Sequence, residues 1–177
     1  MIGKRKAINQ LAYDIRESLN LETPLVNIRD IPVILGGQIL FSNELENDME
    51  AMIEKTNKNF IIRIKDQSNI QRMKFSIAHE LGHLFLHMGY LINEQLWSEA
   101  GNYKDSVYYR NGYGTEENEA NEFAGAFLMP EEEFKTLAKA HLNKGFYNIE
   151  AIAKHFDVSV SAATIRGRWL GLFGWGD

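Results

Sequence analysis

Two histidines and a glutamate with the chemistry of a metal site lie together in the segment His79-Glu80-Leu81-Gly82-His83. In an α-helix, residues four positions apart lie on one face, so both imidazoles can reach a single metal ion. Glu80 projects from nearly the same side, where its carboxylate can accept a proton from a water molecule on that ion. The H-E-x-x-H pattern therefore predicts metal-assisted hydrolysis.

The residues around this segment predict a largely buried helix from Asn69 to Met88. Burying two imidazoles and a carboxylate is costly unless they are hydrogen-bonded or bound to a metal. The apolar setting thus favours a metal site over a chance match to the pattern. The apolar residues that recur at roughly helical spacing are Ile70, Met73, Phe75, Ile77, Ala78, Leu81, Leu84, Phe85 and Leu86.

A catalytic zinc site needs a third protein ligand and an open position for water or substrate. His87 is near in sequence, but it lies about 12 Å from His79 along a helix axis, which is too far for a shared metal. The longer motif with a third histidine requires a glycine three residues after His83, where this chain has Leu86. We expect His87 to end the helix or to hydrogen-bond a ligand from behind.

The better source of a third ligand is a second predicted helix, from Glu116 to its end at Pro130. Its apolar stripe consists of Ala120, Phe123, Ala124, Phe127 and Leu128. Glu117 is the favoured ligand, and Asn121, one turn later on the same face, can hydrogen-bond a metal-bound histidine. Glu119 and then Glu116 are the alternatives. An acidic cluster can also simply be a solvated helix N-terminus.

Both segments resemble the ImmA/IrrE family of zinc metallopeptidases. Phe75 to His87 resembles the family's F-[ST]-[IL]-A-H-E-L-G-H-x-x-x-H block, with Lys74 where arginine is common, and Glu117 to Ala124, closing with Leu128-Met129-Pro130, resembles its second block. The resemblance implies an α+β, zincin-like fold in which His79, His83 and Glu117 bind Zn²⁺ and Glu80 is the general base. It also implies a substrate, an Xre-like helix-turn-helix repressor.

Composition limits the other possibilities. With 177 residues and 45% hydrophobic content, the chain can bury one substantial core, and we expect a metallopeptidase domain over 1–140 and a helical extension over 141–177. The absence of cysteine excludes disulfides and thiolate zinc sites and fits a cytoplasmic protein. No membrane span or signal peptide is recognised. A net charge of −5 argues against nucleic acid or anionic lipid as the main partner.

The remaining patterns predict a small sheet with a hairpin, packed on the metal helix. Its edge strand could pair with an extended substrate. The expected elements are a helix over Lys4–Leu19, a short helix over Asn27–Leu35 ended by glycine, a strand over Gln38–Ser42, and a hairpin of Met49–Thr56 with Phe60–Lys65. The segment Leu91–Glu116, which contains Tyr103, Tyr108, Tyr109 and Tyr113, is expected to be an irregular lid or binding loop.

The C-terminal residues resemble a helix-turn-helix, with one helix over Ile149–Phe156 and a second that is capped by Ser159. Residues 145–177 contain three basic and three acidic residues, namely Lys154, Arg166 and Arg168 against Glu150, Asp157 and Asp177. This balance gives no patch for phosphates, so we expect packing or partner docking rather than DNA binding.

The sequence as a whole favours a zinc-dependent endopeptidase that cleaves a repressor. One alternative is a metal-bound anti-repressor that binds without cleaving, although such a protein would not need Glu80. The other is a DNA-binding regulator with a structural zinc, although closed structural zinc sites are usually built with cysteine, which this chain lacks.

Overall fold

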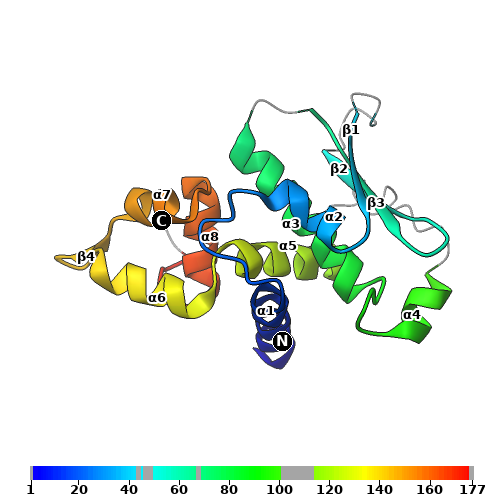
Figure 1. Cartoon of the computed structure of the whole chain (residues 1–177). Coiled ribbons are helices and arrows are strands. Elements are labelled where there is room, and N and C mark those ends of the chain that lie inside the picture. Colours follow the sequence, from blue (N-terminus) through cyan, green and yellow to red (C-terminus); the bar gives the residue numbers. More distant parts are fainter. Residues whose placement is uncertain (1, 43–44, 46–49, 67–68, 101–113, 176–177) are drawn as a thin grey trace. The chain divides into compact units, whose positions relative to one another are not determined.

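Most of the described elements are helices, and they are joined by a small mixed sheet and a short hairpin, which confirms the predicted α+β class (Figure 1). The structure, a computed structural model, describes residues 2–42, 45, 50–66, 69–100 and 114–175. Two compact units are present. We call residues 27–124 the sheet unit and residues 1–26 with 125–177 the helical unit. The predicted division between residues 140 and 141 lies inside the helical unit and stays a prediction.

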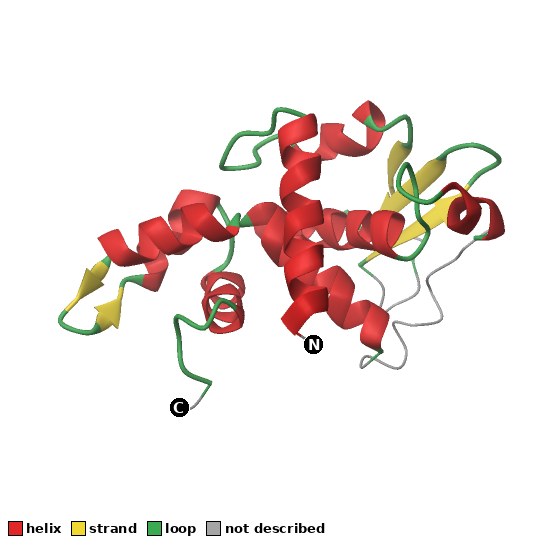
Figure 2. Cartoon of the chain, turned by 90° about the horizontal axis from the view of Figure 1, so that it is seen from below, coloured by secondary structure: helices red, strands yellow, loops and turns green. Residues whose placement is uncertain are grey.

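Strand β3 (Phe60–Ile64) is the centre of the sheet, between β1 (Gln38–Phe41) and β2 (Ala51–Lys55). It runs parallel to β1 and antiparallel to β2, and Lys55 pairs with Phe60 across the turn. Alternate β3 residues, starting with Phe60, are fully buried, as expected for a strand with one face on a core. The predicted strand and hairpin are confirmed, and the strands of this sheet are the yellow arrows that lie side by side on the right of Figure 2.

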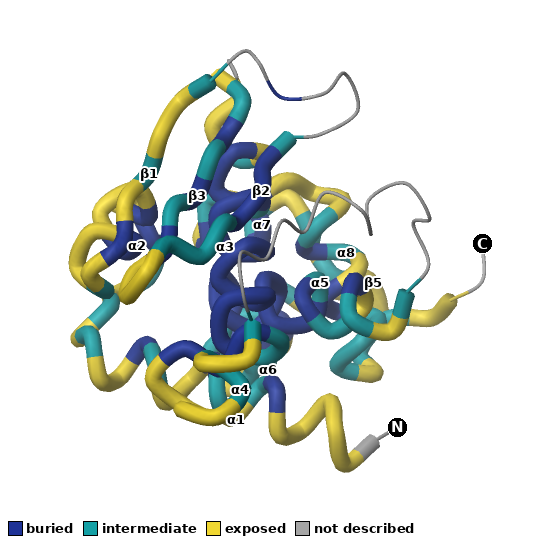
Figure 3. Tube along the Cα trace, turned by 90° about the vertical axis from the view of Figure 1, so that its right-hand side faces the viewer, coloured by how far each residue is buried: buried dark blue, intermediate teal, exposed yellow. Residues whose placement is uncertain are grey.

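The sheet is followed by the long helix α3 (Ile70–Leu86), which packs on β2 and β3. The side chain of Asn69 caps its start by accepting a hydrogen bond from the backbone N–H of Arg72 at 3.0 Å. Most of the helix is buried (Figure 3). The predicted helix is therefore confirmed to within two residues at each end. The short helix predicted before the sheet is a 3₁₀ turn (Ile28–Asp30) continued by α2 (Ile31–Ile34).

Part of the segment expected to be irregular is a helix, α4 (Glu94–Glu99). Asn93 caps it by accepting a hydrogen bond from the backbone N–H of Leu96 at 3.0 Å, a signal that the sequence reading overlooked. The expectation of an irregular segment was therefore wrong for these six residues. The tyrosines at 103, 108, 109 and 113 lie outside the described residues. The second motif helix, α5 (Thr115–Leu128), follows them and is confirmed.

The helical unit contains α1 (Ile2–Ser18), the end of α5, α6 (Glu131–Ala140), a small hairpin (β4, Leu142–Asn143; β5, Phe146–Tyr147), α7 (Ile149–Phe156) and α8 (Val160–Trp169). The last two form the predicted helix-turn-helix arrangement. Asp157 has the left-handed backbone at the turn, and the Ser159 side chain accepts from the backbone N–H of Ala162 at 3.1 Å.

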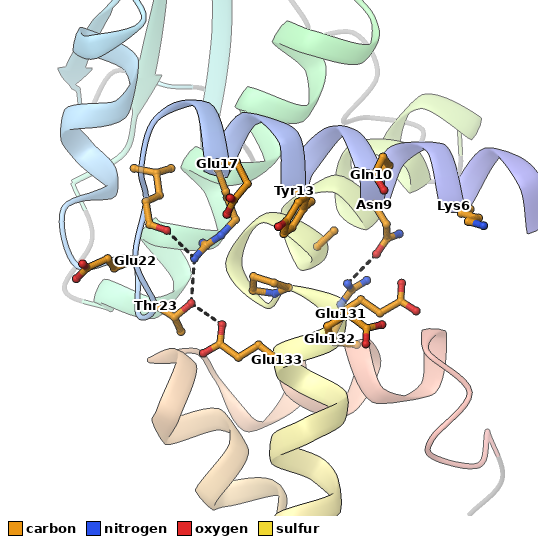
Figure 4. Close-up of a pocket in the computed structure, with 15 residues that line it drawn as sticks. Lys6, Asn9, Gln10, Tyr13, Glu17, Glu22, Thr23, Glu131, Glu132 and Glu133 are labelled. Atoms are coloured by element: carbon orange, nitrogen blue, oxygen red, sulfur yellow. Dashed lines mark hydrogen bonds between the residues drawn. The ribbon is translucent and has the colours of Figure 1, made fainter.

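Two buried arginines join distant segments of the helical unit. Arg16 donates to the Phe127 carbonyl at 2.8 Å, and Arg166 donates to the side chain of Asn9 at 2.7 Å. Both line a cavity of about 710 Å³ between α1 and the start of α6, where the glutamates of α6 face α1 (Figure 4). Through these bonds α1 is tied to the end of α5 and to α8, which lie more than a hundred residues away in the sequence.

None of the helices in the described ranges combines the length and apolar content needed to cross a bilayer.

Candidate metal centre

Helix α3 places His79 and His83 one turn apart on a buried face. Their side chains are 5% and 1% exposed, and their ring centroids are 4.7 Å apart. The two Nε2 atoms approach to 3.0 Å. This is the juxtaposition that the i, i+4 spacing predicts.

Helix α5 brings the carboxylate of Glu117 to the same point. Glu117 Oε2 lies 3.3 Å from the Nε2 of His79, and its Oε1 lies 3.2 Å from the Nε2 of His83. One ligand atom from each of the three residues falls within 4.8 Å of the others, so this group could hold a metal ion. Of the alternative glutamates, Glu119 lies beside His87 instead, and Glu116 is not part of the group.

The surroundings of His79 show that a cation suits this point. Asn121 Oδ1 lies 3.0 Å from the Nδ1 of His79, and because a carbonyl oxygen can only accept, Nδ1 carries the proton. In the neutral ring, Nε2 then presents a lone pair toward His83 and the carboxylate. Three lone-pair donors that converge in a buried place repel one another unless a cation lies between them, and two nitrogens with one carboxylate are a ligand set that Zn²⁺ accepts.

The carboxylate of Glu117 is adapted to carry a negative charge. Burial alone would raise its pKa, but protonated rings of His79 and His83, through their hydrogen bonds and positive charge, hold the pKa well below its ordinary value. A cation bound by the neutral rings would favour the charged carboxylate in the same sense. Its Oε1 is buried and has no hydrogen bond of good geometry among the described residues, although His83 Nε2 is 3.2 Å away. That oxygen is thus available to a bound ion.

A close contact between α3 and α5 allows Glu117 to reach the histidines. A Cβ atom added at Gly82 would stand 3.0 Å from the Cα of Ala120 and 3.1 Å from its carbonyl oxygen. Glycine therefore lets the two helix backbones approach more closely than any side chain would permit. The sequence analysis missed this pair, whose signal is two small residues, one in each motif.

His87 lies beside the Nδ1 of His83 and is not part of the group that could hold a metal ion. It is the C-cap of α3, and its Nδ1 lies 2.8 Å from the Nδ1 of His83. Glu80 is 2% exposed and follows His79 on α3, so the buried helix also carries the predicted general base. The structure thus brings His79, His83 and Glu117 together, and puts Asn121 and His87 behind the two rings.

One helix carries both histidines, a second supplies the carboxylate, and a small mixed sheet packs on the first. These features define a peptidase-like, zincin-type fold. The chain belongs to the Peptidase_M78 family, described as the IrrE N-terminal-like domain, whose sequence model matches residues 39–167. The family predicted from the two motifs is confirmed.

The chain is also similar to a solved structure of a Mycobacterium tuberculosis transcriptional regulator, with 18% sequence identity and a TM-score of 0.60. The likeness covers 90% of this chain and 46% of the regulator, so the chain spans a little under half of that protein's length. At this identity the likeness shows a shared fold. No curated protein matches the chain significantly.

Proposed function

We propose that the chain is a zinc-dependent endopeptidase that cleaves an Xre-like helix-turn-helix repressor in the cytoplasm, where such repressors act. The observation that carries the proposal is the convergence of His79, His83 and Glu117 within 4.8 Å. The presence of Glu80 on the same helix and membership of the M78 family support it. The repressor as substrate comes from the resemblance of the two motifs to the ImmA/IrrE proteins.

The residues have distinct roles in the proposed reaction. A zinc ion held by this group would supply a Lewis acid that lowers the pKa of a water molecule and polarises a carbonyl. Glu80 accepts the proton of the attacking water and then donates it to the leaving amine. Asn121 keeps the ring of His79 in the tautomer whose Nε2 is free of a proton.

The second candidate, a DNA-binding regulator, is favoured by the name of the similar structure, a transcriptional regulator. The basic residues of α8 argue against it. Arg166 is 1% exposed and donates to the Met129 carbonyl, and Arg168 donates to the Gly174 carbonyl. Val160 and Ile165, which are exposed on α8, offer apolar surface that suits a protein partner better than phosphates.

The variant Glu80→Gln separates these functions. A purified repressor from a neighbouring gene is incubated with the wild type and the variant, with and without a metal chelator. We expect the wild type to cut and the variant to bind zinc as tightly as the wild type while cutting at least about 100-fold more slowly, since general base catalysis contributes about 10²–10⁴-fold. The exposed Glu99→Gln is the matched control.

Cleavage that persists in Glu80→Gln, or that is insensitive to the chelator, contradicts the endopeptidase. If the wild type binds the repressor and leaves it whole, the non-cleaving anti-repressor is correct. DNA affinity that falls steeply with added salt, in either protein, would instead favour the regulator.

A further inference from the structure

Three histidine rings lie in a row, His79 and His83 on α3 and His87 at its C-cap. His87 has no role in the proposed metal ligand set. The ring centroids of His83 and His87 are 4.9 Å apart, nearly the 4.7 Å of His79 and His83. The ring of His87 is 7% exposed, and its Nε2 lies 3.4 Å from Oε2 of Glu119, whose side chain is 12% exposed. The largely covered side chains of a histidine and a glutamate therefore lie in line behind His83.

The proton positions along this line follow from the task of His83. If the Nε2 of His83 binds a metal, the proton of the neutral ring is on Nδ1. That Nδ1 lies 2.8 Å from the Nδ1 of His87, so the latter must accept, and His87 carries its own proton on Nε2. The Nε2 proton then points at Oε2 of Glu119. One arrangement of protons satisfies all three residues.

We propose that His87 and Glu119 are positioning residues, which act as a relay that fixes the tautomer and ring orientation of His83. The inference rests on the proposed metal site and adds two residues to it. Metal-binding histidines usually donate a hydrogen bond from their other ring N–H to a carboxylate, a carbonyl or water, and losing that acceptor typically lowers metal affinity about 10- to 100-fold. Here a second histidine stands between the ligand and the carboxylate.

The backbone holds the relay in place from both helices. The backbone N–H of His87 donates to the carbonyl of His83 at 3.0 Å, which fixes the backbone of His87 at the end of α3. Glu119 comes from the first turns of α5, two residues after Glu117. His79 is supported differently, because Asn121 accepts from it directly. The two imidazoles are therefore oriented by separate groups that can be tested one at a time.

The test measures zinc affinity by competition with a chromophoric chelator, so it does not depend on cleavage. We expect His87→Leu to bind zinc about 10- to 100-fold more weakly than the wild type. His87→Asn should regain most of the affinity, because its Oδ1 can stand near the lost Nδ1 and accept from His83. Glu119→Leu should weaken binding, and Glu119→Gln, which keeps an acceptor oxygen, should weaken it less.

Two comparisons complete the design. His141→Leu makes the same chemical change in the helical unit and should leave zinc affinity unchanged. Asn121→Leu removes the support of His79 and should lower affinity to a similar degree as His87→Leu. Metal-free thermal unfolding of each variant reports folding separately, and the rescue by His87→Asn is a result that a merely structural role would not give.

The outcomes separate this inference from the proposed function. Zinc affinity of His87→Leu within two- to threefold of the wild type, or equal weakening in His87→Leu and His87→Asn, overturns the relay. A wild type that binds zinc but cleaves no repressor overturns the endopeptidase and leaves the relay standing. A wild type that binds no zinc overturns both.

Discussion

Each imidazole of the candidate metal centre presents its two ring nitrogens to different neighbours. Nε2 of His79 and of His83 faces the carboxylate of Glu117, and Nδ1 faces a partner within 3.0 Å. The partner of each Nδ1 fixes the tautomer and orientation of the ring, so that the lone pair of Nε2 is directed at the same place in both histidines. The residue types in the motif show which groups are present, and the partners behind the rings decide which nitrogen is available.

At this scale, Glu117→Gln tests whether the carboxylate is a ligand. The substitution keeps the shape of the side chain and removes its charge, so a divalent ion loses an anionic donor. We expect zinc affinity to fall by more than the 10- to 100-fold that is typical of residues that only orient a ligand. Competition with a chelator measures it.

Glu116→Gln is the control, since Glu116 is not part of the converging group. It should leave the affinity near that of the wild type. If Glu116→Gln or Glu119→Gln weakens binding more than Glu117→Gln does, the third ligand has been assigned to the wrong glutamate.

At the scale of the elements, the patterns in the sequence predicted both motif helices and the sheet. Apolar spacing identified α3 and α5, and the strand formers from Phe60 to Ile64 identified the central strand β3. The i, i+4 rule predicted that His79 and His83 share a helix face, and their Nε2 atoms lie 3.0 Å apart. The sequence patterns could not predict how α3 and α5 cross, because the crossing depends on the absence of a side chain at Gly82.

Elements with weak local signals were missed for identifiable reasons. Pro130 was interpreted as the end of one helix, but it is also the N-cap of the next, α6, whose first turn is three glutamates. The β4–β5 hairpin turns through Lys144 and Gly145, both with positive φ. Lysine is not a typical residue for that backbone, so the turn lacked the usual Asn-Gly or Asp-Gly signal.

Gly82→Ala tests the close approach of the two helices. Alanine favours a helix over glycine by about 1 kcal/mol, but its Cβ would stand 3.0 Å from the Cα of Ala120, and backbone cannot move aside as a side chain can. Overpacking typically costs about 1–3 kcal/mol. We expect net destabilisation in denaturant unfolding, together with weaker zinc binding because α5 is displaced with Glu117.

Gly125→Ala provides the comparison within α5. Its added Cβ would meet only side-chain atoms, at 3.7 Å, which is ordinary van der Waals contact. This variant should be neutral or slightly stabilised. Unchanged stability and unchanged zinc affinity in Gly82→Ala would show that the helices separate at no cost.

At the scale of the whole molecule, contacts between distant parts of the chain decide the organisation. Residues 1–26 join the unit that begins again at Gly125. The bond from Arg16 to the carbonyl of Phe127 spans 111 residues, and that from Arg166 to Asn9 spans 157. Local patterns predict elements and say nothing of such pairings. An arginine counted in the sequence as a possible phosphate contact is instead a buried structural donor.

The division into units also predicts where a bound metal stabilises the protein. All atoms that converge on the metal point belong to residues 79–117 of the sheet unit. An ion that binds the folded state alone adds about 2.7 kcal/mol of stability when it is present at 100 times its Kd.

We expect zinc to slow hydrogen exchange in α3 and in the first half of α5, and to leave α7 and α8 unchanged. Exchange measured by mass spectrometry with and without zinc, and with Glu117→Gln as the variant of lowered zinc affinity, provides the check. Equal slowing in α8 would mean that the two units open together, and no slowing in α3 would mean that the ion binds somewhere else.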